Sequence, residues 1–315
     1  MSAVAAVRLA ACAVGTPGSP TTPAARRPAC VNLRLAPVPR STGTGALTAQ
    51  VAGRPLRTAP ARRSRQLRVA TAASAEGASI PKDAVSIVLL SGGVGKRMGA
   101  AIPKQYLELR GKPIATWSLE TFLGMDEVAE VVIVCDPSWK YIFEEALQKA
   151  GSSKPVKFAL PGAERQDSMT NGFKEIRQEA SLVAIHDSAR PMVTAEECRL
   201  CFKDAMATGA AVLGVPVKPT IKEIGPDGYV VKTLQRAALW EVQTPQVIAP
   251  ALLQEGIELV ARNNLEVTDD VSIIEALGKP VKITKGQYTN IKVTTPDDMS
   301  VAERFLDERK EKVPA

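Results

Sequence analysis

Short apolar runs alternate with helix-forming segments from residue 84 onwards, and this alternation limits the possible folds more than any other feature of the chain. The runs are rich in β-branched residues, as expected of parallel strands buried on both faces. Helices between such strands cover the two faces of the sheet. The sequence therefore predicts an α/β fold, a Rossmann-like three-layer sandwich with a mostly parallel twisted sheet. The predicted strands are 84–90, 130–136, 156–160, 182–187 and 210–217, and the predicted helices are 112–124, 137–151, 165–178 and 194–209.

The alternation stops at residue 218. The segment 218–246 contains the turn sequence GPDG with alternating residues around it, which is typical of a β-hairpin. A hairpin outside the main sheet forms a protruding arm, at about 218–240, and such an arm needs a surface to pack on. We therefore expect a homodimer assembled through this dimerisation arm. Beyond it, the sequence predicts a helix at 250–263, strands near 281–284 and 291–293, and a last helix from residue 296.

The positive charge of the chain is concentrated near its N-terminus. The sequence has 40 lysines and arginines against 33 acids, but residues 1–75 hold 11 arginines, no lysine and no acid. Subtracting these leaves 29 cations and 33 acids, a net charge of −4, which does not fit a nucleic-acid-binding surface. An arginine-rich, acid-free segment indicates an organelle transit peptide, with an ordinary disordered tail as the alternative. Its Pro and Gly content favours the plastid stroma, with the functional domain at 76–315.

Two further patterns bear on the class of protein. Cys198 and Cys201 have CxxC spacing, but they lie in a predicted amphipathic helix without a second Cys pair or a His. We therefore expect buried free thiols rather than a zinc or redox site. No run of 18 uninterrupted apolar residues occurs, so no membrane span is expected.

A glycine-rich stretch, SGGVGKRMG, follows the first predicted strand. It is not a P-loop, because Gly95 and Lys96 are followed by Arg97 rather than by Ser or Thr. It is not a dinucleotide fingerprint either, because the third glycine comes one residue late. Glycines nevertheless let backbone N–H groups approach a polyphosphate closely, and neighbouring cations can hold its oxygens. We expect this loop to bind the phosphates of a nucleotide.

Seven motifs, in order, resemble those of one enzyme family. The stretch SGGVGKRMGAAIPKQY is similar to the signature of nucleotidyltransferases that activate sugar or polyol phosphates. It looks most like the 2-C-methyl-D-erythritol 4-phosphate cytidylyltransferase family of the non-mevalonate isoprenoid pathway. PGAERQDSM, HDSARP, PVKPTIK, LW-x-x-QTPQ, TDDVS and NIKVTTPDD follow in that family's order, so the resemblance covers about residues 84–306.

The resemblance implies that CMP is transferred from CTP to methylerythritol 4-phosphate, with release of pyrophosphate. It implies Arg97 and Lys104 as catalytic cations that stabilise the charge growing on the α-phosphorus. Ala163 replaces an acidic residue of some relatives, which is harmless if only its backbone is used. Ser168 has a second interpretation, as a helix N-terminal residue without a ligand. The implied CTP-binding residues are Ser91, Gly92, Gly93, Gly95, Lys96, Gly162, Ala163 and Ser168.

The resemblance also implies Asp187 and Asp269 as ligands of Mg²⁺ or another divalent cation. A turn or helix cap is the alternative role for Asp187, and Asp270 is the candidate cap of the following helix. We interpret His186, the only histidine, as structural, because a phosphate nucleophile is already ionised and needs no base. The implied substrate-binding residues are Thr220, Arg236, Thr244, Thr268 and Lys292, of which Arg236 would reach the site from the partner subunit's arm.

Two alternatives remain open on the sequence. A ribitol-5-phosphate cytidylyltransferase would share almost every motif, although the transit-like segment favours the plastid isoprenoid substrate. A non-catalytic nucleotide-binding module would be expected to carry damaged motifs. The charged motif residues are intact here: Arg97, Lys104, Asp187 and Asp269.

Overall fold

The structure is a computed structural model that describes residues 79–93 and 102–311. These residues belong to one compact unit, Val69–Ala315. The predicted transit segment 1–75 lies outside the described residues, and so do Gly95, Lys96 and Arg97 of the glycine-rich loop. The expectations for those positions therefore stay predictions.

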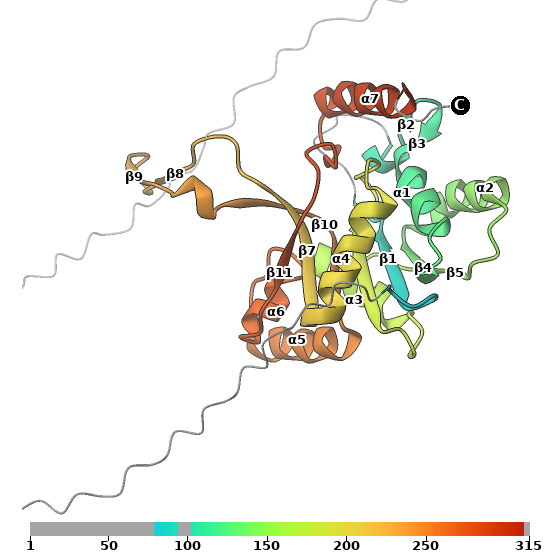
Figure 1. The fold of residues 1–315 in the computed structure, drawn as a ribbon, viewed down its shortest axis with the longest axis horizontal. Coiled ribbons are helices and arrows are strands. Elements are labelled where there is room, and N and C mark those ends of the chain that lie inside the picture. Colours follow the sequence, from blue (N-terminus) through green and yellow to red (C-terminus); the bar gives the residue numbers. More distant parts are fainter. Residues whose placement is uncertain (1–78, 94–101, 312–315) are drawn as a thin grey trace, which may run out of the picture. The chain divides into compact units, whose positions relative to one another are not determined.

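A seven-stranded sheet forms the centre of the described residues (Figure 1). Its strands are β1 (Val85–Leu90), β4 (Val128–Val134), β5 (Val156–Ala159), β6 (Leu182–Asp187), β7 (Ala210–Pro216), β10 (Trp240–Ile248) and β11 (Lys282–Lys285). They are arranged in the order β11-β7-β10-β6-β1-β4-β5. Neighbouring strands are parallel, except that β10 runs antiparallel to β6 and β7. The prediction of a mostly parallel α/β sheet is confirmed.

Helices cover both faces of the sheet, because successive side chains of each strand point to opposite sides. On β1, Ile87 and Leu89 pack with one cluster of helices, and Val88 and Leu90 pack with the other. The first cluster contains α1 (Ile114–Leu123), α2 (Lys140–Ala150) and α4 (Ala195–Thr208), and the second contains α3 (Arg165–Lys174), α5 (Pro250–Asn263) and α6 (Ser272–Ala276). None of the helices in the described residues has the length and apolarity needed to cross a bilayer.

The helix ends follow the local sequence signals. Thr194 and Glu197 form a reciprocal capping box at the start of α4, and Gly209 ends this helix with a φ of 89°. The predicted helix at 250–263 begins at a proline and has the observed bounds of α5. A short 3₁₀ turn, η3 (Pro137–Trp139), precedes α2 where one continuous helix was expected.

The arm is present as a separate two-stranded sheet of β8 (Lys222–Ile224) and β9 (Val230–Thr233), joined by the predicted turn. Figure 1 shows it standing away from the main sheet. Its apolar side chains are exposed, with Tyr229 at 77% and Val231 at 61%. A short 3₁₀ turn, η4 (Arg236–Ala238), leads from the arm back into β10.

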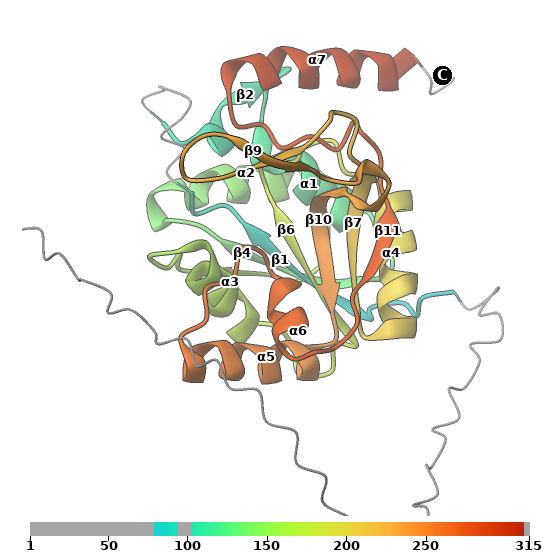
Figure 2. The same ribbon diagram turned by 90° about the vertical axis from the view of Figure 1, so that its left-hand side faces the viewer.

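Two strand predictions near the arm and the C-terminus were wrong. The residues after the arm form β10, an antiparallel strand inside the main sheet, rather than the end of a hairpin. Residues 291–293 form no strand; the N–H of Val293 donates to the carbonyl of Ala189 instead. This segment leads into α7 (Pro296–Glu311), which lies along one end of the sheet near the small hairpin of β2 (Glu108–Leu109) and β3 (Lys112–Pro113) (Figure 2).

Candidate active site

The chain changes direction within the sheet between β1 and β6. After β1 it builds β4 and β5 on one side, and then returns to place β6 on the other side. The two strands are parallel neighbours, and their last residues, Leu90 and Asp187, are paired in register. Ligands of open α/β sheets bind at the carboxyl ends of strands at such a switch point. The glycine-rich segment and the HDSARP motif therefore begin side by side.

A cavity of about 400 Å³ opens at this point. It is lined by residues from the end of β1, the turn after the glycine-rich loop, the start of α3, the end of β6 and the segment before α7. Nine residues that the family motifs implied line it together: Ser91, Gly92, Gly93, Lys104, Gly162, Ala163, Ser168, Asp187 and Lys292.

Two glycines allow the backbone segments of this wall to touch. A Cβ on Gly92 would lie 2.5 Å from Cβ of Pro161, and a Cβ on Gly162 would lie 2.1 Å from Cβ of Asp167. Both distances are below van der Waals contact, so a side chain at either position would push the segments apart. The hydroxyl of Ser168 secures the same turn by accepting from the Gly162 N–H at 2.9 Å. The CTP-binding residues implied on β1 and α3 thus form one continuous surface.

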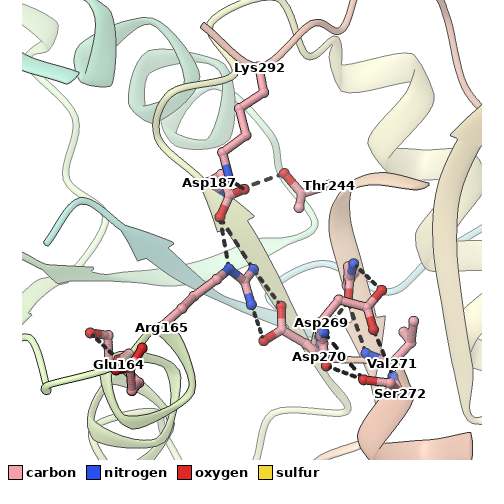
Figure 3. A network of polar contacts seen from close by, with 11 residues as sticks. Glu164, Arg165, Asp187, Thr244, Asp269, Asp270, Val271, Ser272 and Lys292 are labelled. Carbon is pink, nitrogen blue, oxygen red and sulfur yellow. Dashed lines mark hydrogen bonds and ion pairs between the residues drawn. The ribbon is translucent and has the colours of Figure 1, made fainter. Parts of the chain in front are cut away.

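A cluster of alternating charges includes three residues that line the cavity, Arg165, Asp187 and Lys292 (Figure 3). Lys292 Nζ lies 2.6 Å from Asp187 Oδ2, and the Arg165 guanidinium lies 3.3 Å from Asp187 Oδ1. Arg165 also binds both carboxylate oxygens of Asp270, at 2.7 and 2.8 Å. Burial alone would raise the pKa of Asp187, but Arg165 and Lys292 hold that pKa well below its ordinary value. Asp187 is therefore a carboxylate at neutral pH.

The two adjacent aspartates of the TDDVS motif have different partners. The Asp269 carboxylate accepts from the N–H of Ser272, the first residue of α6, at 3.0 Å, and it also accepts from Gln246. Asp270, which was expected to be the cap, pairs with Arg165 instead, so that expectation was wrong. The burial of Asp270 explains its ion pair with Arg165, because a buried carboxylate needs a charged partner.

The described residues contain no group of three or more His, Cys, Asp or Glu side chains that could hold a metal ion. Of the two implied ligands, Asp187 lines the cavity and Asp269 does not. This donor set still fits Mg²⁺, which commonly binds through one or two carboxylates and completes its coordination with phosphate oxygens and water. Asp187 is the residue that could hold the ion in the cavity.

His186 is fully buried and lies in a chain of hydrogen bonds under the site. Its Nε2 faces the carbonyl of Arg190 at 3.2 Å, and since a carbonyl only accepts, Nε2 carries the proton. Nδ1 then accepts from the Thr244 hydroxyl at 3.0 Å, and that hydroxyl accepts from the Asp187 N–H at 3.2 Å. The structural interpretation of His186 agrees with this geometry. Burial, as the largest influence, lowers the pKa of His186 to about 4.

The single histidine permits a simple titration. We expect its imidazole Hε1 resonance to stay at the neutral position between pH 8 and about pH 5.5, because the pKa is lowered to about 4 from 6.5. As the pH falls, the unfolded chain takes up this proton before the folded chain does. The contribution of His186 to the free energy of unfolding is therefore fully present above about pH 6.5, and about 3 kcal/mol of it is lost as the pH falls towards 4. Proton NMR against pH measures the midpoint, and a value near 6.5 would contradict the buried neutral assignment.

The remaining implied substrate residues are not gathered in this cavity. Thr220, Arg236 and Thr268 are exposed and do not line it. Arg236 donates to the carbonyl of Lys218, within the base of the arm. Thr244 lies next to Asp187, but it is buried, and its hydroxyl is engaged with His186. Lys292 is the residue of this set that lines the cavity.

The CxxC pair has no chemical role visible in the structure. Cys198 and Cys201 are both free and buried on α4, and burial raises the pKa of both thiols. A protonated, inaccessible thiol is a poor nucleophile and a poor metal ligand. The expectation of buried free thiols is confirmed.

Sequence reasoning missed two residues that contact Asp187 or the glycine-rich segment. Arg165 bridges Asp187 and Asp270, and Gln105 contacts the glycine-rich segment. Both lie inside motifs that had been identified, ERQDS and PKQY. Their positions in these motifs were the available signal, but the partners of both side chains lie far away in the sequence, so no local pattern shows their contacts.

Comparison with known proteins identifies the family. The sequence profile of the 2-C-methyl-D-erythritol 4-phosphate cytidylyltransferase family matches residues 85–308. The chain belongs to this family. The match spans every element from β1 into α7, so all seven motifs and the cavity lie inside it.

Curated members of this cytidylyltransferase family are similar over most of the chain. A rice protein named 2-C-methyl-D-erythritol 4-phosphate cytidylyltransferase, chloroplastic, is 58% identical over 240 residues, which are 76% of this chain and 80% of the rice chain. A protein of the same enzyme name from Desulforamulus reducens is 38% identical over 223 residues, 70% of this chain and 95% of its own.

Solved structures of family members share the fold. The enzyme from Anaerococcus prevotii, described as 4-diphosphocytidyl-2C-methyl-D-erythritol synthase, matches with a TM-score of 0.64 and 26% identity, covering 71% of this chain and 98% of its own. The 2-C-methyl-D-erythritol 4-phosphate cytidylyltransferase of Thermus thermophilus matches with a TM-score of 0.57 and 30% identity, at the same coverage.

Proposed function

We propose that this chain transfers CMP from CTP to 2-C-methyl-D-erythritol 4-phosphate, with the cavity at the ends of β1 and β6 as the active site. One observation supports this most strongly. Nine residues implied by the family motifs, from segments as much as 200 residues apart, line a single cavity. Family membership supplies the reaction, and the cations around the cavity suit two phosphorylated substrates.

The chemistry needs little from the protein beyond position and charge. A phosphate oxygen of the polyol substrate attacks the α-phosphorus of CTP, the bond from that phosphorus to the bridging oxygen breaks, and pyrophosphate leaves with that oxygen. Lys104 and Arg97 are proposed to stabilise the negative charge that develops on the α-phosphate. The nucleophile is already ionised at neutral pH, so the neutral, buried His186 is not required as a base.

A divalent cation, with Mg²⁺ as the candidate, is proposed to bind Asp187 together with the phosphates of CTP. Such an ion neutralises phosphate charge when bound. The supporting observation is that Asp187 is ionised, lines the cavity and lies next to Lys292. Arg165 keeps this carboxylate in place from the opposite side.

Recognition of cytosine is proposed to use the turn at the start of α3. Gly162 and Ala163 would offer backbone groups, and Ser168 its hydroxyl. All three line the cavity, and the tight contact between Gly162 and Asp167 fixes the backbone there. The absence of an acidic side chain at Ala163 leaves this backbone recognition intact.

The arm is proposed to pair two copies of the chain, so that Thr220 and Arg236 reach the partner's cavity. Two features support the proposal. The arm exposes apolar side chains, including Tyr229, Val230 and Val231, that would otherwise face water. Arg236 is exposed and does not line the cavity of its own subunit. Thr244 and Thr268 stay proposed contacts on the subunit that holds the cavity.

Mixing two inactive variants tests the shared site. We expect Lys104→Met and Arg236→Ala each to be nearly inactive alone, and their co-expressed mixture to regain about a quarter of wild-type turnover, because half of the random dimers carry one intact site. Turnover is measured on the purified mixture. Mixing Lys104→Met with Asp187→Asn is the control, because both residues belong to the same cavity, and no activity should return. A mixture of Lys104→Met and Arg236→Ala that stays inactive would contradict an arm that acts in trans.

The plastid is the proposed location. The arginine-rich segment 1–75 supports it, and the rice relative is named as chloroplastic. Import into isolated chloroplasts, with and without residues 1–75, provides the test. Uptake that does not depend on this segment would refute the assignment.

The proposed reaction is tested by pyrophosphate release. The purified protein is given CTP and Mg²⁺ with methylerythritol 4-phosphate or with ribitol 5-phosphate, and the reaction is repeated with UTP and ATP. Release with CTP and methylerythritol 4-phosphate alone is the expected result. A preference for ribitol 5-phosphate would keep the mechanism but change the substrate, and no release with any pair would refute the proposed function.

A further inference from the structure

Gln105 lines the cavity, and its carboxamide is engaged by the backbone of the glycine-rich segment. It lies on the 3₁₀ turn η2 (Lys104–Tyr106), directly after Lys104, and its side chain is 3% exposed. Its Nε2 donates to the carbonyl of Ser91 at 2.7 Å and to the carbonyl of Gly93 at 2.8 Å. Both partners only accept, so the amide nitrogen, and not its oxygen, faces them. The two N–H bonds of one carboxamide thus hold the backbone on both sides of Gly92.

These two hydrogen bonds of Gln105 fix the direction of the Gly92 N–H. The peptide bond between Ser91 and Gly92 is trans, so its carbonyl and its N–H point in opposite directions. The Ser91 carbonyl points at Gln105, and the Gly92 N–H therefore points away from it. Within the described residues that N–H donates to no protein atom, and Gly92 lines the cavity. The Gly92 N–H is therefore a fixed hydrogen-bond donor in a site that suits an anion.

The backbone at Ser91 is also restrained from three other directions. Its N–H donates to the carbonyl of Val134 on the neighbouring strand at 2.8 Å. Its hydroxyl accepts from Ser188 at 3.0 Å, and the hydroxyl of Tyr106 adds a second hydrogen bond to its carbonyl at 2.9 Å. Gln105 differs from these contacts because it alone also reaches Gly93. Among the described contacts, it is the one that joins Gly93 to the turn that carries Lys104.

We propose that Gln105 is a positioning residue for the CTP phosphates: its carboxamide holds the peptide planes around Gly92 so that the backbone donors stay directed into the cavity, in register with Lys104. This inference rests on the proposed function, because it assigns a residue to the same site. It requires no contact between Gln105 and the nucleotide. Preorganised donors stabilise a ligand more than donors that must first rotate into place.

The test replaces the carboxamide by groups of similar size that cannot donate twice. In Gln105→Met both hydrogen bonds are lost, and in Gln105→Glu a carboxylate faces two carbonyl oxygens. We expect the Kd for CTP, measured by calorimetry without the polyol phosphate, to rise by up to about 25-fold in Gln105→Met, since two hydrogen bonds that order the free site, each worth roughly a factor of five, no longer do so before binding. The affinity of Gln105→Glu for CTP should fall at least as much. The KM for methylerythritol 4-phosphate should change less than about threefold in both variants.

Tyr106→Phe is the matched control. It removes the other side-chain hydrogen bond to the Ser91 carbonyl, but that carbonyl keeps Gln105 as a partner, and no buried polar group is left unpaired. The Kd for CTP should therefore change less than about threefold. Thermal melting of all three variants reports on folding, and Gln105→Glu remains informative if Gln105→Met is unstable.

Three results would decide against the inference or its basis. An unchanged CTP affinity in both Gln105 variants would overturn it. Equal losses for CTP and for the polyol phosphate would indicate a general structural role and would also overturn it. Failure of the wild-type protein to bind CTP would instead refute the proposed function, which separates the two failures.

Discussion

Replacing Lys104 with methionine is expected to reduce kcat by about 10²–10³, because one preorganised charge that meets the developing negative charge contributes a factor of this size. Methionine keeps the length and most of the volume of the side chain, so η2 and the neighbouring Gln105 contacts should persist. The charge on the α-phosphate is greatest in the transition state. The Kd for CTP should therefore rise much less than kcat falls.

Steady-state kinetics and CTP calorimetry together measure this difference. Lys174→Met is the matched control, because Lys174 is exposed on α3 and does not line the cavity. Its kcat should stay within about twofold of wild type. If Lys104→Met instead raised the Kd for CTP while kcat held, Lys104 would be a ground-state phosphate contact, and the catalytic role would pass to Arg97 alone.

The elements of the fold were predictable where short-range signals agree with long-range packing. The strand β1 is apolar except for Ser86 because both of its faces are buried, and α4 carries its own capping box and terminal glycine. In the strand β10 the short-range signals and the long-range packing disagree. Its sequence, WEVQTPQVI, contains a proline and several polar side chains, which normally argue against a central strand.

Those polar side chains on β10 have partners that lie far away in the sequence. Gln246 accepts from the N–H groups of Asp270 and Val271, Thr244 binds His186, and Gln243 donates to the carbonyl of Gln287. A strand stabilised by such contacts looks like a loop in the sequence. The same reason explains why 291–293 was expected to be a strand: its apolar residues pack under α7 and not in the sheet.

In the candidate site, too, some residues were predictable from the sequence and others were not. Residues that face the ligand sit in recognisable motifs, and nine of them were brought together by the fold. The contacts that hold them, such as Arg165 to Asp270, join residues 105 positions apart. No local pattern records a pairing of that kind. The different partners of Asp269 and Asp270 also depended on it, because the sequence does not show which of the two aspartates pairs with Arg165.

The proposed metal site offers the second large effect. We expect Asp187→Asn to lower kcat/KM by at least about 10² and to raise the Mg²⁺ concentration for half-maximal activity, because the amide removes the charge that a hard cation requires. Binding of Mn²⁺ to the complex with CTP, followed by electron paramagnetic resonance, provides a readout that does not depend on turnover. Arg165 keeps Asp270 as its partner in this variant, so the fold should survive.

Asp269→Asn decides whether the site uses one carboxylate or two. In this variant the asparagine Oδ1 can still accept from the Ser272 N–H, and only the hydrogen bond from Gln246 is lost, so α6 should keep its position. With one carboxylate, Asp269→Asn should bind Mn²⁺ and respond to Mg²⁺ like the wild type. A shift as large as that of Asp187→Asn would mean that Asp269 turns from Gln246 towards the cavity when CTP binds, and the two-carboxylate site implied by the family motifs would be restored.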